Sequence, residues 1–370
     1  MQDFTAGITN ALPNEVHKPS GRPEIDAKIR ELVVEYGCTT SCELIEQLVM
    51  TALKMSSDGI NVADLKLFNR SLNELRYAAR TFAPYRTKRK VCIFGSARTG
   101  ASEPEFLAAR EFAAKLVKHG YMVITGAGEG IMGAAQLGAG AADSFGLNIR
   151  LPFEQGANAV IHGDPKLITF NYFFTRKLNF VKETHAIALF PGGFGTMDEG
   201  FEVLTLIQTG KSRIIPFVLV DKPGGTYWKT WVEFLESHLL AQGLISPDDL
   251  RLFHVAPSVD AAVEEIARFY HHFRSYRWVR DRMVIRLARR LTDGAVERLN
   301  TDFADILIGS EIVQGAALAA EKNEPDIVHL PRLILTPHRR NFGRLRALID
   351  AINAADAEEP VSGADARSAD

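Results

Sequence analysis

Two acidic residues follow a run of glycines in the stretch FPGGFGTMDE, which spans residues 190–199. Glycine lets backbone N–H groups approach an anion, because no Cβ stands in the way. A helix that begins at such a loop adds partial positive charge, so the stretch predicts a phosphate cradle with the Thr196 hydroxyl as a further donor. Asp198 and Glu199 would then lie beside the phosphate, where a carboxylate can hold sugar hydroxyls or activate water. The alternative is that these acids only complement the helix dipole.

Two other glycine loops follow short apolar runs in the same way. They are FGSARTG at residues 94–100 and TGAGEGIMG at residues 125–133. The carboxyl ends of the strands in an open parallel sheet share one edge, and ligands bind there. Three such loops at one edge favour a phosphate-bearing ligand over three tight turns that bind nothing. The candidate residues of the loops are Gly95, Ser96, Gly126, Gly128, Gly130, Gly192, Gly193, Gly195 and Thr196.

Two nucleotide-binding motifs help to define the ligand. GEGIMG, at residues 128–133, has the form of the dinucleotide fingerprint G-x-G-x-x-G, but it follows the second apolar run and not the first. Arg150 stands where an acid for the ribose is expected, which leaves an NADP-dependent oxidoreductase as a rival interpretation. The sequence has no G-x-x-x-x-G-K-[ST] motif, so it predicts no P-loop.

A basic pair, Arg176 and Lys177, precedes the opening motif on a segment with helical spacing. A guanidinium beside a glycine cradle can clamp a phosphate or hold a leaving base. The alternative is ordinary charge on a helix surface. Glu202 lies about one turn beyond Glu199 and is expected to share its helix face.

The elements that must position these residues alternate along the chain. Apolar runs that predict strands alternate with segments of helical periodicity, and they lie at residues 90–94, 121–125, 145–151, 185–190 and 214–220, with a possible sixth at 252–258. Continuously apolar strands separated by helices indicate an α/β fold. We expect a Rossmann-like, doubly wound parallel sheet with helices on both faces, plus helical N- and C-terminal extensions.

The expected domains follow from these changes in pattern. They are a helical N-terminal extension at 1–88 that starts with a loose arm, a nucleotide-binding core at 89–273, a mostly helical C-terminal extension at 274–353 and a disordered tail at 354–370. Residues 274–298 carry eight arginines against three acids and are expected to form a basic helix. This helix would face solvent or another subunit; the alternative is a regulatory or nucleic-acid surface. A strand is possible at 331–336.

The composition is that of an ordinary globular protein. The 370 residues are 46% hydrophobic and 24% charged, and the net charge of −2 gives no overall attraction to nucleic acid or to a membrane. No apolar run approaches the roughly 18 residues of a membrane helix, and the first residues do not have the pattern of a signal peptide. Three cysteines, Cys38, Cys42 and Cys92, suit a reducing cytoplasm, which is the expected location. No second ligand pair accompanies Cys38 and Cys42, so no metal site is expected.

The combined motifs resemble the LOG (LONELY GUY) family, whose members are often labelled lysine decarboxylases. The family signature is P-G-G-x-G-T-x-x-E after an Arg-Lys pair, and this chain has Pro191, Gly192, Gly193, Gly195, Thr196 and Glu199 after Arg176 and Lys177. FGSAR and TGAGEGIMGAA also look like the first two loops of the family, although Glu129 stands where proline is common. The resemblance covers about residues 89–255.

The resemblance implies hydrolysis of the N-glycosidic bond of a nucleoside 5′-monophosphate, such as a cytokinin riboside monophosphate or AMP, to free base and ribose 5-phosphate. Arg176 and Glu199 match the family's catalytic pair. Glu199 would stabilise an oxocarbenium-like sugar or orient water, Arg176 would stabilise the departing base, and the 5′-phosphate would anchor the substrate. No cofactor is expected. The resemblance also implies a homodimer or a larger homo-oligomer. Further candidates for substrate contacts are Glu154, Asn158, Lys177, Asp198, Glu202 and Thr205.

A non-catalytic nucleotide carrier or sensor on the same fold is the main alternative. Such a protein needs only the glycine loops, so the presence of Arg176 and Glu199 favours the enzyme. A lysine decarboxylase would use a pyridoxal Schiff base, for which Lys177 beside Arg176 is a poor candidate.

Overall fold

The computed structural model describes residues 20–151, 156–309, 311–321 and 324–358. The chain divides into two compact units, one of residues 8–79 and one that takes in residues 80–370. None of the helices in the described residues is long and apolar enough to cross a membrane. The loose arm predicted at the N-terminus and most of the predicted disordered tail lie outside the described residues.

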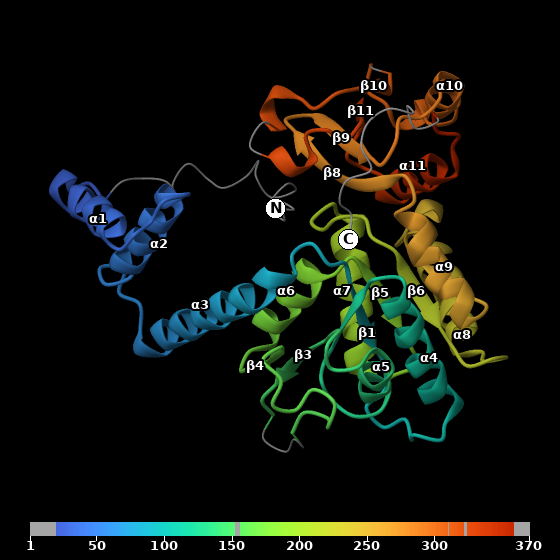
Figure 1. Ribbon diagram of the computed structural model, residues 1–370, viewed down its shortest axis with the longest axis horizontal. Coiled ribbons are helices and arrows are strands. Elements are labelled where there is room, and N and C mark those ends of the chain that lie inside the picture. The colour runs from blue at the N-terminus through green and yellow to red at the C-terminus, as the bar shows by residue number, and fades with distance from the viewer. Residues whose placement is uncertain (1–19, 152–155, 310, 322–323, 359–370) are drawn as a thin grey trace. The chain divides into compact units, whose positions relative to one another are not determined.

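The smaller unit is helical, as its periodicity predicts. It contains α1 (Pro23–Glu35), α2 (Cys42–Lys54) and most of α3 (Val62–Phe82). Proline at the first position of α1 suits a helix start, where its missing N–H would have no partner in any case. Helices α1 and α2 lie side by side (Figure 1), and Ile29 and Val33 of α1 are buried one turn apart.

A seven-stranded parallel sheet forms the centre of the larger unit, in the order β4-β3-β2-β1-β5-β6-β7. The strand order reverses between β1 and β5, which is where open α/β sheets bind ligands. The α/β fold predicted from the sequence is therefore confirmed. The strands are β1 (Lys90–Phe94), β2 (Met122–Thr125), β3 (Ser144–Ile149), β4 (Leu167–Phe170), β5 (Ala186–Leu189), β6 (Phe217–Val220) and β7 (His254–Ala256).

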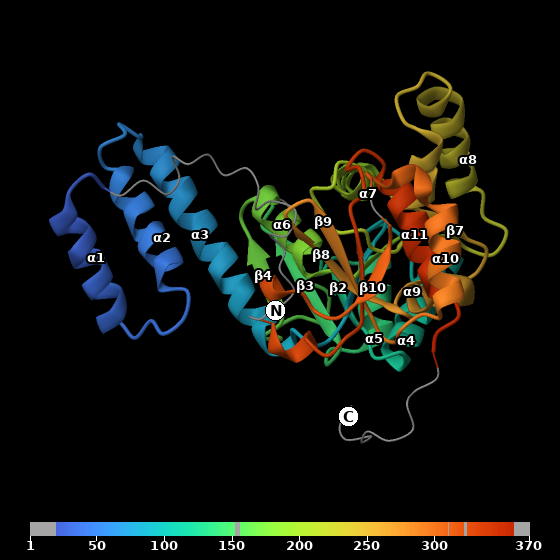
Figure 2. The same cartoon turned by 90° about the horizontal axis from the view of Figure 1, so that it is seen from above.

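Helices cover both faces of this sheet. On one face α4 (Pro104–Lys118), α5 (Ile131–Ala139) and α9 (Val259–Phe269) pack over inward-facing side chains that include Val91 and Ile93 of β1. Both views show α4 and α5 next to each other (Figures 1 and 2). On the other face α6 (Phe173–Glu183) contacts the alternate residues of β1, where the ring of Phe94 packs edge-on against Phe180 at 4.8 Å. This alternation is the two-residue period of a strand.

The prediction of a basic helix at residues 274–298 is wrong. The first part of this segment forms an antiparallel hairpin of β8 (Phe273–Val279) and β9 (Arg282–Leu287), and its last residues belong to α10 (Asp293–Asp302). Side chains 283–287 are all buried, so this run lacks the exposed face that a surface helix would have. Arg280 takes the left-handed conformation, with a φ of 57°, in the short turn that joins the strands.

The hairpin belongs to a second sheet, of order β10-β11-β9-β8. The possible strand at 331–336 is present as β11 (Arg332–Leu335), beside β10 (Val313–Gly315), and α11 (Phe342–Ala354) follows. Arginines in this region are partly internal: Arg286 is buried and binds Glu321 at 2.8 Å and Glu324 at 2.6 Å. The C-terminal extension thus combines helices with an antiparallel sheet, and its arginines do not form one solvated face.

Candidate active site

The three glycine loops follow adjacent strands, in the order β2, β1 and β5, at the carboxyl edge of the parallel sheet. Hydrogen bonds join them directly. The Ser96 N–H donates to the carbonyl of Pro191 at 3.0 Å, and the Ile131 N–H donates to the carbonyl of Ser96 at 3.0 Å. The first loop therefore links the other two. The three motifs, which were predicted to lie at one edge of the sheet, are found together at its carboxyl edge.

Several of these glycines are needed for close packing between the loops. A Cβ on Gly130 would lie 2.3 Å from the carbonyl oxygen of Ser96, and the φ of Gly130 is +63°. A Cβ on Gly95 would lie 2.7 Å from Ile131, and one on Gly126 would lie 2.5 Å from Nη2 of Arg176. Contact of Gly95, Gly126, Gly128 and Gly130 with phosphate stays a prediction. Close packing already requires the absence of a side chain at Gly95 and Gly130.

The third loop has open space where helix α7 (Phe194–Gln208) begins. An ideal Cβ on Gly193 or Gly195 would meet no heavy atom of the described residues within 4 Å, whereas one on Gly192 would lie 2.2 Å from Oγ1 of Thr196. The first N–H groups of a helix have no acceptor within it. Donors and open space therefore coincide at Gly193 and Gly195, which is what an anion requires.

Arg176 of α6 is held next to the second loop. Its Nε donates to the carbonyl of Leu147 at 2.8 Å, and its guanidinium lies over the ring of Phe180 at 5.2 Å. The guanidinium also lies against Gly126, so a side chain at that position would displace it. Arg176 is therefore positioned between the strand ends and the glycine loops, beside Glu199, whose pKa its charge lowers.

Lys177 joins α6 to the first turns of α7. Its Nζ lies 2.7 Å from Asp198, 2.9 Å from Glu202 and 3.4 Å from Glu199. Burial lowers the pKa of Lys177, but the hydrogen bonds to Asp198 and Glu202 and the charge of Glu199 outweigh it and raise that pKa. The lysine thus stays charged. Asp198 and Glu202, both predicted to contact substrate, each form an ion pair with this ammonium.

Glu199 is the most unusual group at the site. Only 6% of it is exposed, and its Oε2 has no hydrogen-bond partner among the described residues. Burial raises the pKa of the carboxyl to about 7, against the opposing charges of Lys177 and Arg176. Near neutral pH both protonation states are therefore populated. A buried oxygen without a partner costs free energy, which is typical of a group reserved for a ligand or a reaction.

The remaining predicted residues differ in their placement. The Asn158 side-chain amide donates to the carbonyls of Ala127 at 3.1 Å and Gly128 at 2.9 Å, so it supports the second loop. Thr205 is exposed and lies six residues beyond Glu199, which at 100° per residue turns it away from the buried face of α7. Thr196 is buried at the helix start. Glu154 lies outside the described residues.

Sequence reasoning missed two residues at this edge. Met132 covers the second loop, with its Cε 2.7 Å from an ideal Cβ on Gly128. The hydroxyl of Tyr227, the first residue of α8 (Tyr227–Phe234), donates to the carbonyl of Gly192 at 2.5 Å. Helix α8 follows β6, so its start must lie at the carboxyl edge, and this topological signal could have identified Tyr227.

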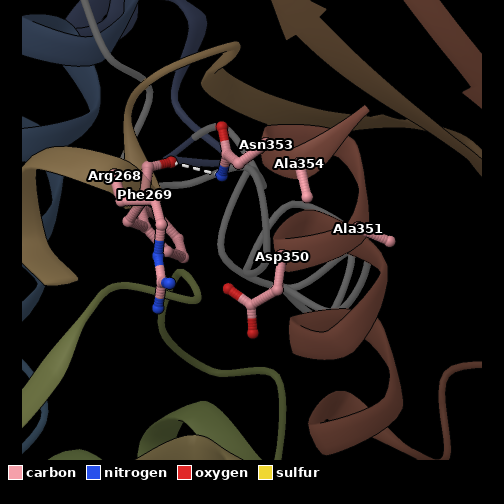
Figure 3. Close-up of a pocket in the computed structure, with 6 residues that line it drawn as sticks. All are labelled: Arg268, Phe269, Asp350, Ala351, Asn353 and Ala354. Carbon is pink, nitrogen blue, oxygen red and sulfur yellow. Dashed lines mark hydrogen bonds between the residues drawn. The ribbon is translucent and has the colours of Figure 1, made fainter. Parts of the chain in front are cut away.

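A separate cavity of about 380 Å³ lies between α9 and α11 (Figure 3). Its polar groups are already paired: the Asn353 amide donates to the carbonyl of Phe269 at 2.6 Å, and Asp350 accepts from Arg346 at 3.0 Å. None of the residues that line this cavity comes from the glycine loops. The lining residues are Arg268, Phe269, Asp350, Ala351, Asn353 and Ala354. The glycine-loop edge therefore remains the candidate site.

Comparison with known proteins agrees with the motifs. A family profile described as "Possible lysine decarboxylase" matches residues 132–266. A probable cytokinin riboside 5′-monophosphate phosphoribohydrolase of Oryza sativa subsp. japonica, LOGL5, is 27% identical over 175 residues, which are 46% of this chain and 68% of that protein. The resemblance to the LOG family is confirmed.

Other LOG proteins have similar identity over the same share of the chain. The cytokinin riboside 5′-monophosphate phosphoribohydrolase LOG5 of Arabidopsis thaliana is 24% identical over 189 residues, 49% of this chain and 78% of that protein. A solved structure of the molybdenum cofactor carrier protein of Chlamydomonas reinhardtii is 19% identical and covers 49% of this chain and 97% of its own, with a TM-score of 0.35. A TM-score this low carries no functional argument. The LOG relatives, in contrast, support a phosphoribohydrolase at the level of the family.

Proposed function

We propose that this protein hydrolyses the N-glycosidic bond of a nucleoside 5′-monophosphate and releases the free base and ribose 5-phosphate. The observation that supports this most is the buried carboxyl of Glu199, whose Oε2 is unpartnered among the described residues. It lies in the first turns of α7, directly after the open space at Gly193 and Gly195. A phosphate bound at the helix start would place the sugar of the same nucleotide near this carboxyl.

The reaction separates charge, and the site has groups for both signs. As the base leaves with the electron pair of the glycosidic bond, positive charge develops on the sugar, which an ionised Glu199 stabilises. The base takes up a proton, and water adds to the sugar carbon and loses one. Arg176, fixed by its bond to Leu147, would stabilise the negative charge that develops on the base. Lys177 helps to keep Glu199 ionised near neutral pH, since its charge lowers the pKa that burial raises.

Release of free base from a panel of nucleoside 5′-monophosphates, including AMP and cytokinin riboside monophosphates, tests the proposal. The corresponding nucleosides without phosphate are the substrate controls. We expect release from monophosphates alone, and its loss in Glu199→Gln, which keeps the size of the side chain and removes its charge. Glu264→Gln, at an exposed position on α9, makes the same substitution away from the site and should leave the rate unchanged.

The panel also separates the alternatives. A wild-type protein that binds nucleotides but releases no base would be a carrier or sensor. Full activity in Glu199→Gln would contradict the role given to that residue. Binding of NADP in preference to monophosphates would favour the oxidoreductase, for which Arg150 is the candidate contact to the 2′-phosphate.

We also propose that the protein acts as a homodimer or larger homo-oligomer in the cytoplasm. Helices α6 and α7, which Lys177 joins, expose five large apolar residues on their outer faces, and Phe194 is 97% exposed. Large apolar side chains that gather on a protein surface typically mark an interface. Light scattering on the purified protein measures the assembly; a monomer at micromolar concentration would contradict it. The five residues are Phe173, Phe174, Leu178, Phe194 and Phe201.

A further inference from the structure

The geometry points to Tyr227 as a positioning residue that aims the backbone N–H of Gly193 into the phosphate cradle, an inference that rests on the proposed function. Tyr227 does not follow from the glycine motif, because it lies on α8, after the next strand of the sheet. Its hydroxyl donates to the carbonyl of Gly192, 2.5 Å away, and so links the loop after β6 to the loop after β5.

Because a trans peptide is planar, the hydrogen bond from Tyr227 to the Gly192 carbonyl also fixes the direction of the Gly193 N–H. The described residues contain no cis peptide, so the carbonyl of Gly192 and the N–H of Gly193 point in opposite directions from their shared peptide plane. Because Tyr227 holds the carbonyl on its own side, the N–H of Gly193 points to the other side. No described residue accepts a hydrogen bond from that N–H, and an ideal Cβ on Gly193 meets no described atom within 4 Å. The donor is therefore available to an anion at the start of α7.

Without the hydroxyl, little else opposes rotation of this peptide. Glycine on both sides permits a wide range of φ and ψ, so the peptide between Gly192 and Gly193 can flip at low cost. A flipped peptide would direct a carbonyl oxygen, not an N–H, towards the phosphate, and so repel it. Tyr227 thus selects the anion-binding orientation of a loop that glycine makes flexible.

Tyr227 is itself held in place on several sides. Its N–H donates to Oδ2 of Asp221 at 3.1 Å, and its ring packs edge-on against Trp228 at 4.8 Å. Trp228 is 1% exposed, and its indole N–H donates to the carbonyl of Val220 at 2.9 Å. A Cβ on Gly225 would lie 2.2 Å from the Asp221 carboxyl, so glycine there leaves room for the carboxyl that accepts from Tyr227. The hydroxyl is therefore fixed before a ligand binds, which is what a positioning role requires.

Tyr270, the residue that follows α9, provides a matched control at the opposite end of β5. Its hydroxyl donates to the carbonyl of His185, which lies immediately before β5, whereas Gly192 lies beyond the other end of β5. Tyr227→Phe and Tyr270→Phe thus each remove one tyrosine hydrogen bond to a backbone carbonyl. Only the first of these carbonyls belongs to the cradle.

The experiment measures KM and kcat for base release from AMP, and the Kd of ribose 5-phosphate by calorimetry, in wild type and both variants. We expect Tyr227→Phe to raise KM and Kd about fivefold, as for the loss of one neutral hydrogen bond, with kcat nearly unchanged. Tyr270→Phe should leave all three values as in the wild type. Melting temperatures of both variants report any loss of stability.

The outcomes separate this inference from the proposed function. Wild-type KM and Kd in Tyr227→Phe, equal increases in Tyr270→Phe, or a fall in kcat alone would overturn the positioning role while the hydrolase stands. A wild-type protein that binds ribose 5-phosphate but releases no base would overturn the hydrolase, and the Kd values would still decide the role of Tyr227. A wild-type protein that neither binds nor reacts would overturn both.

Discussion

Replacing Glu199 with glutamine should stabilise the protein at alkaline pH while abolishing its activity. The pKa of Glu199 is about 7 in the folded protein, against an ordinary value of 4.5. The folded state therefore holds the proton more tightly than the unfolded chain, and stability is greatest below about pH 4.5. As pH rises through about 7, the folded protein must also ionise the buried carboxyl, and this contribution to stability is lost.

The size of the effect follows from the two pKa values. They differ by about 2.5, and at 1.36 kcal/mol for each pH unit the ionised carboxyl costs about 3 kcal/mol above pH 8. The unpartnered Oε2 is consistent with a cost of this order. Glutamine has nearly the same shape and no charge, so it avoids most of this cost. Lys177 keeps Asp198 and Glu202 as partners in the variant.

Urea unfolding of wild type and Glu199→Gln between pH 5 and 9 would measure how the free energy of unfolding of each protein depends on pH. We expect the free energies of unfolding to be similar near pH 5 and to diverge as pH rises, with the variant more stable by about 3 kcal/mol at pH 8 to 9. Parallel curves, or a variant less stable than wild type at pH 8, would refute the reasoning. That outcome would mean that Lys177 and Arg176 stabilise the carboxylate more than burial penalises it.

Three further results are expected from the same geometry. Base release should decline below about pH 7, because protonation of Glu199 removes the charge that stabilises the sugar cation; a kcat/KM profile without this acidic limb would count against its role. Arg176→Lys should lower kcat about 100-fold, because lysine cannot both bind Leu147 and reach the base, and stopped assays with AMP would show it. Gly130→Ala should cost more than about 2 kcal/mol in urea unfolding, since its Cβ would lie 2.3 Å from the Ser96 carbonyl at a positive φ, whereas Gly195→Ala, which faces open space, should fold normally.

The sequence predicted most of the parallel sheet because its strands are buried on both faces and therefore read as uninterrupted apolar runs. It missed β4 (Leu167–Phe170), a short strand in which Thr169 is exposed. It also misassigned the hairpin of β8 and β9, since arginines that are paired with glutamates elsewhere in the chain resemble the polar face of a helix. Partners such as Glu321 lie far along the chain, so no local pattern could reveal them.

The sequence by itself predicted the α/β fold and placed the glycine loops at the carboxyl edge of its sheet, because strand ends and helix starts follow from local periodicity. The resemblance to the LOG family added the prediction that Arg176 and Glu199 form the catalytic pair. Only the tertiary structure showed that Oε2 of Glu199 is buried without a described partner, that burial raises its pKa to about 7, and that Tyr227 holds the Gly192 carbonyl. Burial, and hydrogen bonds between residues far apart in the chain, exist only once separate elements pack together, and these set the electrostatics of the site.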